Sequence, residues 1–417
     1  MAEEIIAGLD IGSSMVRVAV AQRVPGEDGK PTLHVIGAVS TPSSGMHKGA
    51  VSSMEDAVSS VSKALEKAER MTGIPVNAAW TSIAGHHILV QESRGVIGVS
   101  RPDGEIKEED VDRALEAART VSTPANFEIL HVIPKGFTVD GQRGIKDPVG
   151  MNGIRLEVDA LIIQTLASHI KNFTKSVYRT GLEIEDLVFS PLATAECVLT
   201  SRQKELGVCV VDMGASSTSM AVYEEGELLH TAVLPVGGDH ITNDIAIGLR
   251  TSLEIAEQVK IQVGNAIPDA VDRKGLVSLV EFGGQEDEPV KLRFLAEIIE
   301  ARVEEFCEAI DNELRKIDRS GMLPVGVIFT GGGVKLPGVL EVAKRVLRLP
   351  VTIGGPIHVS SVIDEVRDPA YATAVGLAIW GNTIRSAQKG GFKFKVSFKG
   401  IGKAKDQVKK WIQSLIP

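Results

Sequence analysis

The sequence predicts an α/β protein built from two related halves. A strand–turn–strand pattern at Gly8–Ser14 returns about halfway along the chain, at Val211–Thr218. Both copies begin with a short apolar run that is typical of a buried strand, and segments with a helical pattern lie between them. In register, the repeat aligns Asp10 with Asp212, Gly12 with Gly214, Ser14 with Ser216, and Ala19-Val20 with Ala221-Val222.

Each copy has residues suited to holding phosphate. A glycine permits a tight turn after the strand, and the small residues beside it leave successive backbone N–H groups free to bind an anion. Two such turns facing each other would grip one polyphosphate from both sides. Asp10 and Asp212 would repel phosphate, so we expect them to hold a hydrated Mg²⁺ ion. A single Asp-x-Gly-Ser is more often a surface turn, but the duplication favours the phosphate site.

A third glycine turn supports the pair. Val327–Gly338 reads as a buried strand, then three consecutive glycines, then a helix. Glycines at a strand end permit close approach by a flat ligand or by phosphate, and a helix N-terminus favours anions.

The remaining elements can be predicted in chain order. Residues 1–84 read as three strands, a helix over Ser53–Thr72 and a further strand. A compact segment, 85–163, follows, with strands near 88–92, 128–132 and 154–163 and a charged helix over 108–119. Residues 164–200 return to the first half. The second half opens near Gly207, and its strongest helices are Thr251–Gly264 and Leu292–Asp318, separated by a loop at 283–289.

Composition excludes several classes of protein. Only 4% of the residues are aromatic, which argues against a nucleic-acid stacking surface. Cys197, Cys209 and Cys307 are widely spaced, so we expect reduced core thiols of a cytoplasmic protein rather than a disulfide or a zinc site. The N-terminus has no signal-peptide pattern, and no apolar run approaches the roughly 18 residues of a membrane span.

The C-terminal end differs in charge from the rest of the chain. From Lys389 onward eight lysines and one aspartate give +7, which leaves −16 for residues 1–388 of the net −9. At helical spacing the last residues form a basic amphipathic helix, which favours an interfacial membrane anchor over docking on the protein's own core. Its expected membrane-facing residues are Ile401, Val408, Trp411, Ile412, Leu415 and Ile416, with Lys405 and Lys409 at the boundary.

These motifs resemble the actin, Hsp70 and sugar-kinase ATPase superfamily, which shares the two phosphate turns and the glycine turn. Its two connecting helices correspond to Ser190–Leu199 and Pro369–Ile379. Within it, Gly45–Ala50, Asp147–Glu157, the 85–163 insertion and the basic tail resemble the FtsA family of bacterial cell-division proteins. The resemblance covers essentially the whole chain.

The resemblance implies an actin-like ATPase fold of two duplicated ribonuclease-H-like domains with an inserted, SHS2-like subdomain. It implies the following parts: 1–84, 164–206 and about 360–386 as the first domain (1A); 85–163 as the insertion (1C); 207–245 and about 312–359 as the second domain (2A); 246–311 as a helical subdomain (2B); 387–400 as a basic linker; and 401–417 as the membrane-targeting helix.

The resemblance also implies roles for single residues. ATP phosphates would contact Gly12, Ser13 and Ser14 on one side and Gly214, Ala215, Ser216 and Ser217 on the other. Adenosine would lie against Gly331, Gly332 and Gly333, and Glu257 and Lys260 would reach the ribose and adenine unless they form a solvated helix face. Arg293 and Arg302 are candidates to meet an acidic FtsZ peptide, although a solvated helix face would explain them equally well.

One position departs from the superfamily. Many ATP-hydrolysing relatives have glutamate where Ser190 stands, and serine is a far poorer general base. Glu196 lies six residues further on and is not expected to substitute for it. We therefore expect ATP binding with slow or no hydrolysis, and leave the catalytic residue unassigned.

As a whole, the resemblance implies an ATP- and Mg²⁺-binding protein that polymerises and tethers FtsZ filaments, by their C-terminal peptide, to the cytoplasmic face of the cell membrane at the division septum. Later division proteins would bind the 85–163 insertion, and no nucleic acid is expected. The alternatives are a related pilus-assembly ATP-binding protein and a metabolite kinase; a chaperone is disfavoured because no peptide-binding domain follows.

Overall fold

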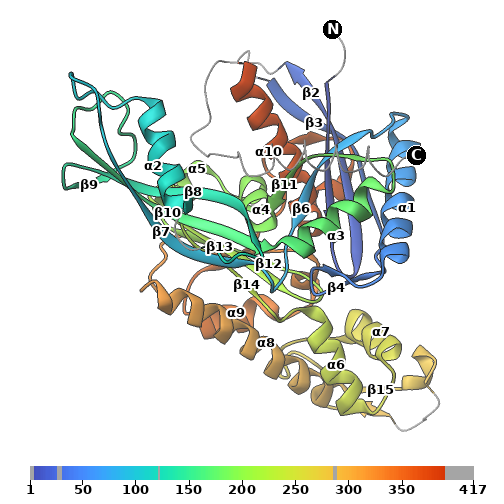
Figure 1. Cartoon of the computed structure of the whole chain (residues 1–417). Coiled ribbons are helices and arrows are strands. Elements are labelled where there is room, and N and C mark those ends of the chain that lie inside the picture. The colour runs from blue at the N-terminus through green and yellow to red at the C-terminus, as the bar shows by residue number, and fades with distance from the viewer. Residues whose placement is uncertain (1–3, 26–30, 121–122, 285–288, 390–417) are drawn as a thin grey trace.

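The computed structural model describes residues 4–25, 31–120, 123–284 and 289–389 (Figure 1). The expected terminal helix at 401–417 and most of the expected linker at 387–400 lie outside this range. Within the described residues, no helix combines the length and the apolar character needed to cross a membrane.

The first half is built on a six-stranded sheet with the strand order β11-β6-β1-β2-β3-β19. Antiparallel pairs join β1 to β2 and β2 to β3, whereas β6 and β11 run parallel to β1. Its strands are β1 (Glu4–Ile11), β2 (Met15–Pro25), β3 (Pro31–Pro42), β6 (Ala78–Ile83), β11 (Glu183–Phe189) and β19 (Ser360–Ser361). A small hairpin, β4 (Met46–His47) and β5 (Ala50–Val51), follows β3 and had not been expected from the sequence.

Helices cover both faces of this sheet. Helix α1 (Met54–Thr72) packs on β2 and β3 and touches α3 (Ala167–Tyr178), while α10 (Ala372–Lys389) packs on β1, β2 and β6. The ends of α1 follow from its sequence, because the Ser53 hydroxyl accepts a hydrogen bond from the Asp56 N–H and Gly73 closes the helix at φ 70°.

The second half repeats this arrangement. Its five-stranded sheet has the order β14-β13-β12-β17-β18, again with three antiparallel strands followed by parallel ones. Its strands are β12 (Val208–Met213), β13 (Thr218–Glu224), β14 (Glu227–Leu234), β17 (Gly326–Thr330) and β18 (Val351–Ile353). Its helices are α6 (Gly238–Leu249), α7 (Leu253–Val263), α8 (Leu292–Lys316) and α9 (Val339–Leu347), and α5 (Ser201–Leu206), which precedes β12, contacts β13. The sequence repeat therefore corresponds to a repeat of the fold.

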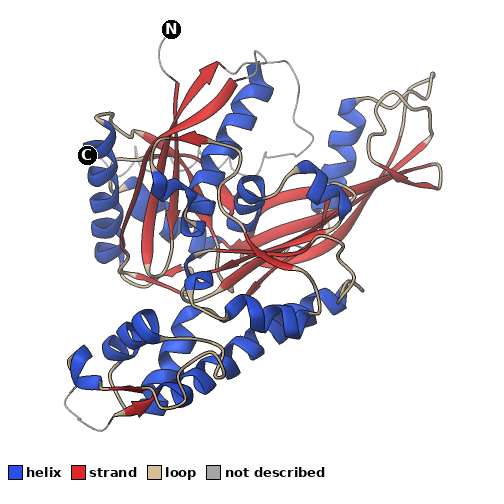
Figure 2. Cartoon of the chain, turned by 180° about the vertical axis from the view of Figure 1, so that it is seen from behind, coloured by secondary structure: helices blue, strands red, loops and turns tan. Residues whose placement is uncertain are grey.

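Helices α6 and α7 gather with the short strands β15 (Leu276–Val277) and β16 (Val290–Lys291) at one end of the molecule (Figures 1 and 2). The described residues also contain four short 3₁₀ helices: η1 (Leu279–Phe282), η2 (Gly332–Lys335), η3 (Asp364–Arg367) and η4 (Pro369–Tyr371). Each half has its own large buried core.

The insertion forms a separate sheet that projects from the first half (Figure 1). Its strand order is β7-β10-β8-β9, and α2 packs on β7 and β10 over a third small core. The elements are β7 (Leu89–Gly98), α2 (Glu108–Thr120), β8 (Phe127–Val139), β9 (Gln142–Ile145) and β10 (Arg155–Leu166).

Two connecting helices cross between the halves. Helix α4 (Ser190–Val198) packs against α10, and a Cβ on Gly376 would lie only 2.0 Å from the Ala193 carbonyl oxygen. The hydroxyls of Thr194 and Thr373 are hydrogen-bonded at 2.8 Å in this crossing. The close approach requires glycine and holds α10 beside the strand ends of both sheets.

Candidate functional site

A cavity of about 420 Å³ lies between the two halves, where the ends of β1, β12 and β17 meet. This volume is within the range of small-molecule sites. The cavity is lined by every residue that the sequence assigned to phosphate, magnesium or adenosine: Asp10, Gly12, Ser13, Ser14, Asp212, Gly214, Ala215, Ser216, Ser217, Glu257, Lys260, Gly331, Gly332 and Gly333.

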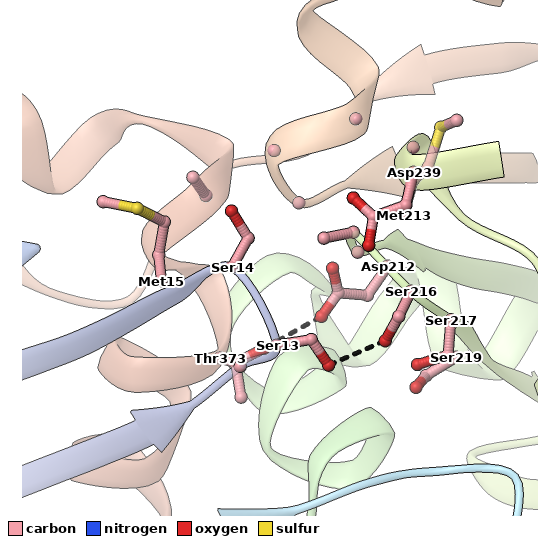
Figure 3. A pocket seen from close by; sticks show the side chains of 18 of the residues that line it. Ser13, Ser14, Met15, Asp212, Met213, Ser216, Ser217, Ser219, Asp239 and Thr373 are labelled. Carbon is pink, nitrogen blue, oxygen red and sulfur yellow. Dashed lines mark hydrogen bonds between the residues drawn. The ribbon is translucent and has the colours of Figure 1, made fainter. Parts of the chain in front are cut away.

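The two repeated turns face each other across this cavity (Figure 3). Each is closed by the same backbone hydrogen bond, from the Gly12 N–H to the Met15 oxygen at 3.0 Å and from the Gly214 N–H to the Ser217 oxygen at 3.1 Å. The Ser13 and Ser216 hydroxyls touch across the gap at 2.7 Å. The two copies of the sequence repeat therefore form a pair of matched turns that line the same cavity.

The two aspartates lie at the base of the cavity, each held by a hydroxyl. Ser82 donates a hydrogen bond to Asp10 at 2.6 Å, and Thr373 of α10 donates one to Asp212 at 3.0 Å (Figure 3). Burial raises the pKa of Asp10, and burial together with the Asp10 charge raises the pKa of Asp212 to about 6. The guanidinium of Arg17 lowers both pKa values and only partly offsets these effects.

A cation between these two carboxylates would favour their ionised forms and offset the raised pKa values, so the pair is suited to a metal ion. Among the described residues no group of three or more Asp, Glu, His or Cys side chains is arranged to hold a metal. Two carboxylates suit Mg²⁺, which usually takes one or two carboxylates and completes its shell with water and phosphate oxygens.

The glycine turn closes the cavity from the second half. A Cβ on Gly331 would lie 2.2 Å from an Asp212 carboxylate oxygen, and one on Gly333 would lie 2.5 Å from the Met213 side chain. A Cβ on Gly332 would meet only the Arg17 guanidinium, at an ordinary contact distance of 3.9 Å. The helix expected directly after these glycines is only the 3₁₀ helix η2, because Pro337 and Gly338, at φ 87°, interrupt the chain before α9 begins.

The side chain of Lys260 is 12% exposed and that of Glu257 is 43% exposed, so this pair is only partly solvated. Both line the cavity, and they form an ion pair of 2.5 Å on α7. Lys260 also donates hydrogen bonds to the Thr242 hydroxyl at 2.7 Å and to the Gly238 oxygen at 3.1 Å. The pair therefore ties α7 to the first turns of α6, beside the second phosphate turn.

Ser190 lines the cavity at the start of α4 and is buried. Glu196 is engaged elsewhere, in an ion pair of 2.6 Å with Lys204, and is not among the described residues that line the cavity. It does not take the place of a glutamate at position 190.

Other lining residues had not been assigned from the sequence. Ser82 and Thr373 hold the aspartates, and Asp239 enters the cavity from the start of α6. The Gly237-Gly238-Asp239 sequence, placed between a strand and a helix, was the available signal for the last of these.

Arg293 and Arg302 lie outside the cavity lining, in α8. Arg302 makes a two-pronged ion pair with Asp244 of α6, at 2.5 and 2.9 Å, and these hydrogen bonds raise its pKa. Arg293 contacts Asp269 and Glu297. The eight expected membrane-contact residues, Ile401 to Ile416, lie outside the described residues.

Comparisons with known structures confirm the predicted fold. A structure described as the PilM-PilN type IV pilus biogenesis complex aligns over 90% of this chain and 98% of its own, with a TM-score of 0.65 at 18% identity. MreB5 of Spiroplasma citri bound to ADP aligns over 93% of this chain and 98% of its own, with a TM-score of 0.55 at 12% identity. At these identities the likeness concerns the actin-like fold alone.

Sequence comparison is more specific. The family model "Cell division protein FtsA" matches residues 209–376, and "SHS2 domain inserted in FTSA" matches residues 85–164. The cell division protein FtsA of Pseudomonas aeruginosa is 35% identical over 98% of both chains, and that of Bacillus subtilis is 40% identical over 94% of this chain and 87% of its own. Since both relatives are at least 35% identical over more than nine-tenths of this chain, the chain belongs to the FtsA family of cell division proteins.

Proposed function

We propose that this chain is an ATP-binding, actin-like division protein that polymerises and tethers FtsZ filaments to the cell membrane. The observation that carries the proposal is the pair of matched turns facing each other across one cavity, with Ser13 and Ser216 in contact at 2.7 Å. Backbone N–H groups on both sides of a gap suit a polyphosphate.

In this proposal the phosphates contact Gly12–Ser14 and Gly214–Ser217. Mg²⁺ would be held through water by Asp10 and Asp212, where it would neutralise phosphate charge. Adenosine would lie against Gly331, Gly332 and Gly333, with Glu257 and Lys260 near the ribose. Two structures of MreB5, described as bound to ADP and to AMPPNP, share the fold, which supports nucleotide binding by this chain.

ATP would act as a switch because several contacts between the halves border the cavity. The Ser13–Ser216 hydrogen bond and an ion pair between Lys335 and Asp368 link elements of the two halves. A polyphosphate between the turns would replace the first contact. If ATP binds one relative position of the two halves more tightly than another, it would favour that position. The surface available for polymerisation would change with it. The serine at position 190 supports slow hydrolysis.

The helical part around α6, α7 and α8 is the proposed site for the FtsZ C-terminal peptide. Arg293 is better placed than Arg302 for an acidic peptide, because its partners Asp269 and Glu297 are largely exposed and easily displaced. Arg302 is committed to Asp244. Arg293→Ala should weaken peptide binding with little loss of stability, whereas Arg302→Ala should also loosen the contact between α6 and α8.

The domain boundaries predicted from the sequence, and the location at the cytoplasmic face of the membrane at the septum, are part of the proposal. The basic helix at 401–417 would anchor the chain, and the 85–163 insertion would receive later division proteins. The net +7 from Lys389 onward supports binding to anionic lipid.

The test is co-sedimentation of the full chain, ATP, Mg²⁺ and a fluorescent FtsZ tail peptide with anionic liposomes. We expect the peptide to pellet only with the full chain, and to remain in solution with a chain that ends at Ser386. Equal pelleting of the peptide by the two chains would refute the anchor, and failure of the full chain to carry the peptide would refute the tether.

A further inference from the structure

The cavity contains one carboxylate that the proposed nucleotide site does not use. Of the acids that line it, Asp10 and Asp212 are assigned to Mg²⁺, and Glu257 is bound by Lys260 and by the Thr242 hydroxyl. Asp239 remains.

The backbone around Asp239 is fixed to the second phosphate turn. The Asp239 N–H donates a hydrogen bond to the Ala215 oxygen at 2.8 Å, and the Gly238 N–H donates one to the Gly214 oxygen at 3.0 Å. A Cβ on Gly237 would lie 2.5 Å from the Ala215 oxygen, so only glycine permits this approach. Whatever the turn binds is therefore held at a constant position relative to Asp239.

The side chain of Asp239 points into the space between the turns, on the side of Asp212 and facing Ser14 (Figure 3). Its surface is exposed because the cavity is open, so water reaches it. Partial burial nevertheless removes part of its solvation and raises the pKa of the carboxyl. Lys260, His240 and His47 lower that pKa, and Glu257 raises it.

The other polar groups near the phosphate end are weaker bases. Ser13, Ser82, Ser190 and Ser219 line the same cavity, but a hydroxyl accepts a proton poorly at neutral pH. Arg17 and Lys335 are cations. A carboxylate with a raised pKa is the remaining group suited to accept a proton from water.

We propose that Asp239 orients the water that attacks the terminal phosphate of bound ATP and accepts its proton; this rests on the proposed nucleotide site. The water oxygen forms a bond to the γ-phosphorus, and the bond from that phosphorus to the bridging oxygen breaks, with its electron pair leaving on ADP. The proton passes to the Asp239 carboxylate and then to solvent in the open cavity. The products are ADP and phosphate, and no further reactant is needed.

The test separates binding from hydrolysis in the full chain. ATP affinity is measured by titration, and the rate is measured in a single turnover of γ-labelled ATP. We expect Asp239→Asn to bind ATP within about twofold of wild type but to hydrolyse it about 100-fold more slowly. Asp239→Glu, which keeps a carboxylate, should recover part of the rate. Glu254→Gln is the matched control, since Glu254 also lies in the first turn of a helix but outside the cavity lining.

A second readout does not depend on turnover. Carbodiimide labelling followed by mass spectrometry should modify Asp239 in the free protein and be blocked by a non-hydrolysable ATP analogue, while labelling of Glu254 is unchanged by the analogue.

Four results would overturn the proposal: a wild-type rate in Asp239→Asn, loss of ATP affinity in that variant, labelling of Asp239 that the analogue does not block, or ATP binding by the wild type without measurable turnover. Each leaves the nucleotide site standing. Failure of the wild type to bind ATP would instead remove the proposed function itself.

Discussion

Replacing Asp212 by asparagine should stabilise the nucleotide-free protein while it destroys Mg²⁺-dependent ATP binding. The reason is that the pKa of Asp212 is raised from 3.8 to about 6 by burial and by the Asp10 charge. An amide has no charge to bury, and its oxygen can still accept the hydrogen bond from Thr373.

The magnitude follows from the difference between the folded and unfolded pKa values. Each pKa unit corresponds to about 1.4 kcal/mol, so the ionised Asp212 costs the folded state about 3 kcal/mol above pH 6. As pH rises from about 4, the unfolded chain loses this proton before the folded chain does, so the wild-type stability falls until about pH 6 and then levels off. At about pH 4.5 only about 1 kcal/mol of the cost is present.

The assay is denaturant unfolding in the presence of a chelator, at about pH 7.5 and about pH 4.5. The free energy of unfolding of Asp212→Asn should exceed that of the wild type by about 3 kcal/mol at the higher pH and by about 1 kcal/mol at the lower pH. Asp110→Asn is a control of opposite sign. Burial alone would raise the Asp110 pKa, but hydrogen bonds from Lys107 N–H and Arg113, with the Arg101 charge, bring it below its usual value. An Asp212→Asn protein that is less stable than wild type at pH 7.5, or equally improved at both pH values, would refute the reasoning.

Two other substitutions test the framework around the site. Gly376→Ala should reduce the free energy of unfolding by about 1–3 kcal/mol, because its Cβ would lie 2.0 Å from the Ala193 oxygen. Gly136→Ala is the control, because a Cβ there meets nothing within 4 Å and should not reduce this free energy. Equal effects of the two substitutions in denaturant unfolding would contradict this reasoning. His131 accepts a hydrogen bond from the Phe189 N–H, and burial lowers its pKa to about 4. The free energy of unfolding of the wild type should therefore fall by about 3 kcal/mol as pH falls from about 6.5 to 4. His131→Gln should be less stable than the wild type at neutral pH, but its stability should not show this fall between about pH 6.5 and 4. The same dependence of unfolding free energy on pH in both proteins would show that His131 is not its source.

The two matched turns could be predicted because their geometry is local. Glycine and small residues at a strand end form such a turn from within one short segment, and the repeat showed that two segments share the form. The burial of both strands and the position of the glycine turn at Gly331 could be predicted for the same reason, since each depends on a few neighbouring residues.

The remaining parts of the site depend on contacts between distant segments. Asp239 is positioned by backbone hydrogen bonds from residues 238 and 239 to the oxygens of Gly214 and Ala215. The sequence does not indicate that these two segments are hydrogen-bonded to each other. Thr373 reaches Asp212 only because α10 crosses α4 closely.

The partners of surface arginines are also difficult to predict from the sequence. The sequence makes Arg302 a candidate to meet an acidic peptide. Its partner Asp244 lies on another helix, and a helical sequence pattern shows only partners three or four residues away.

The most direct test of the central claim is a calorimetric titration of ATP with Mg²⁺ into the wild type, Gly214→Ala and the control Gly136→Ala. A Cβ at position 214 would lie 2.7 Å from the Ser217 oxygen that closes the turn, whereas one at position 136 meets nothing within 4 Å. If ATP is bound between the two turns, the wild type and Gly136→Ala should bind it equally, and Gly214→Ala should bind it at least about tenfold more weakly, a loss of about 1.4 kcal/mol. Equal affinity in all three proteins, or no binding by the wild type, would contradict the account.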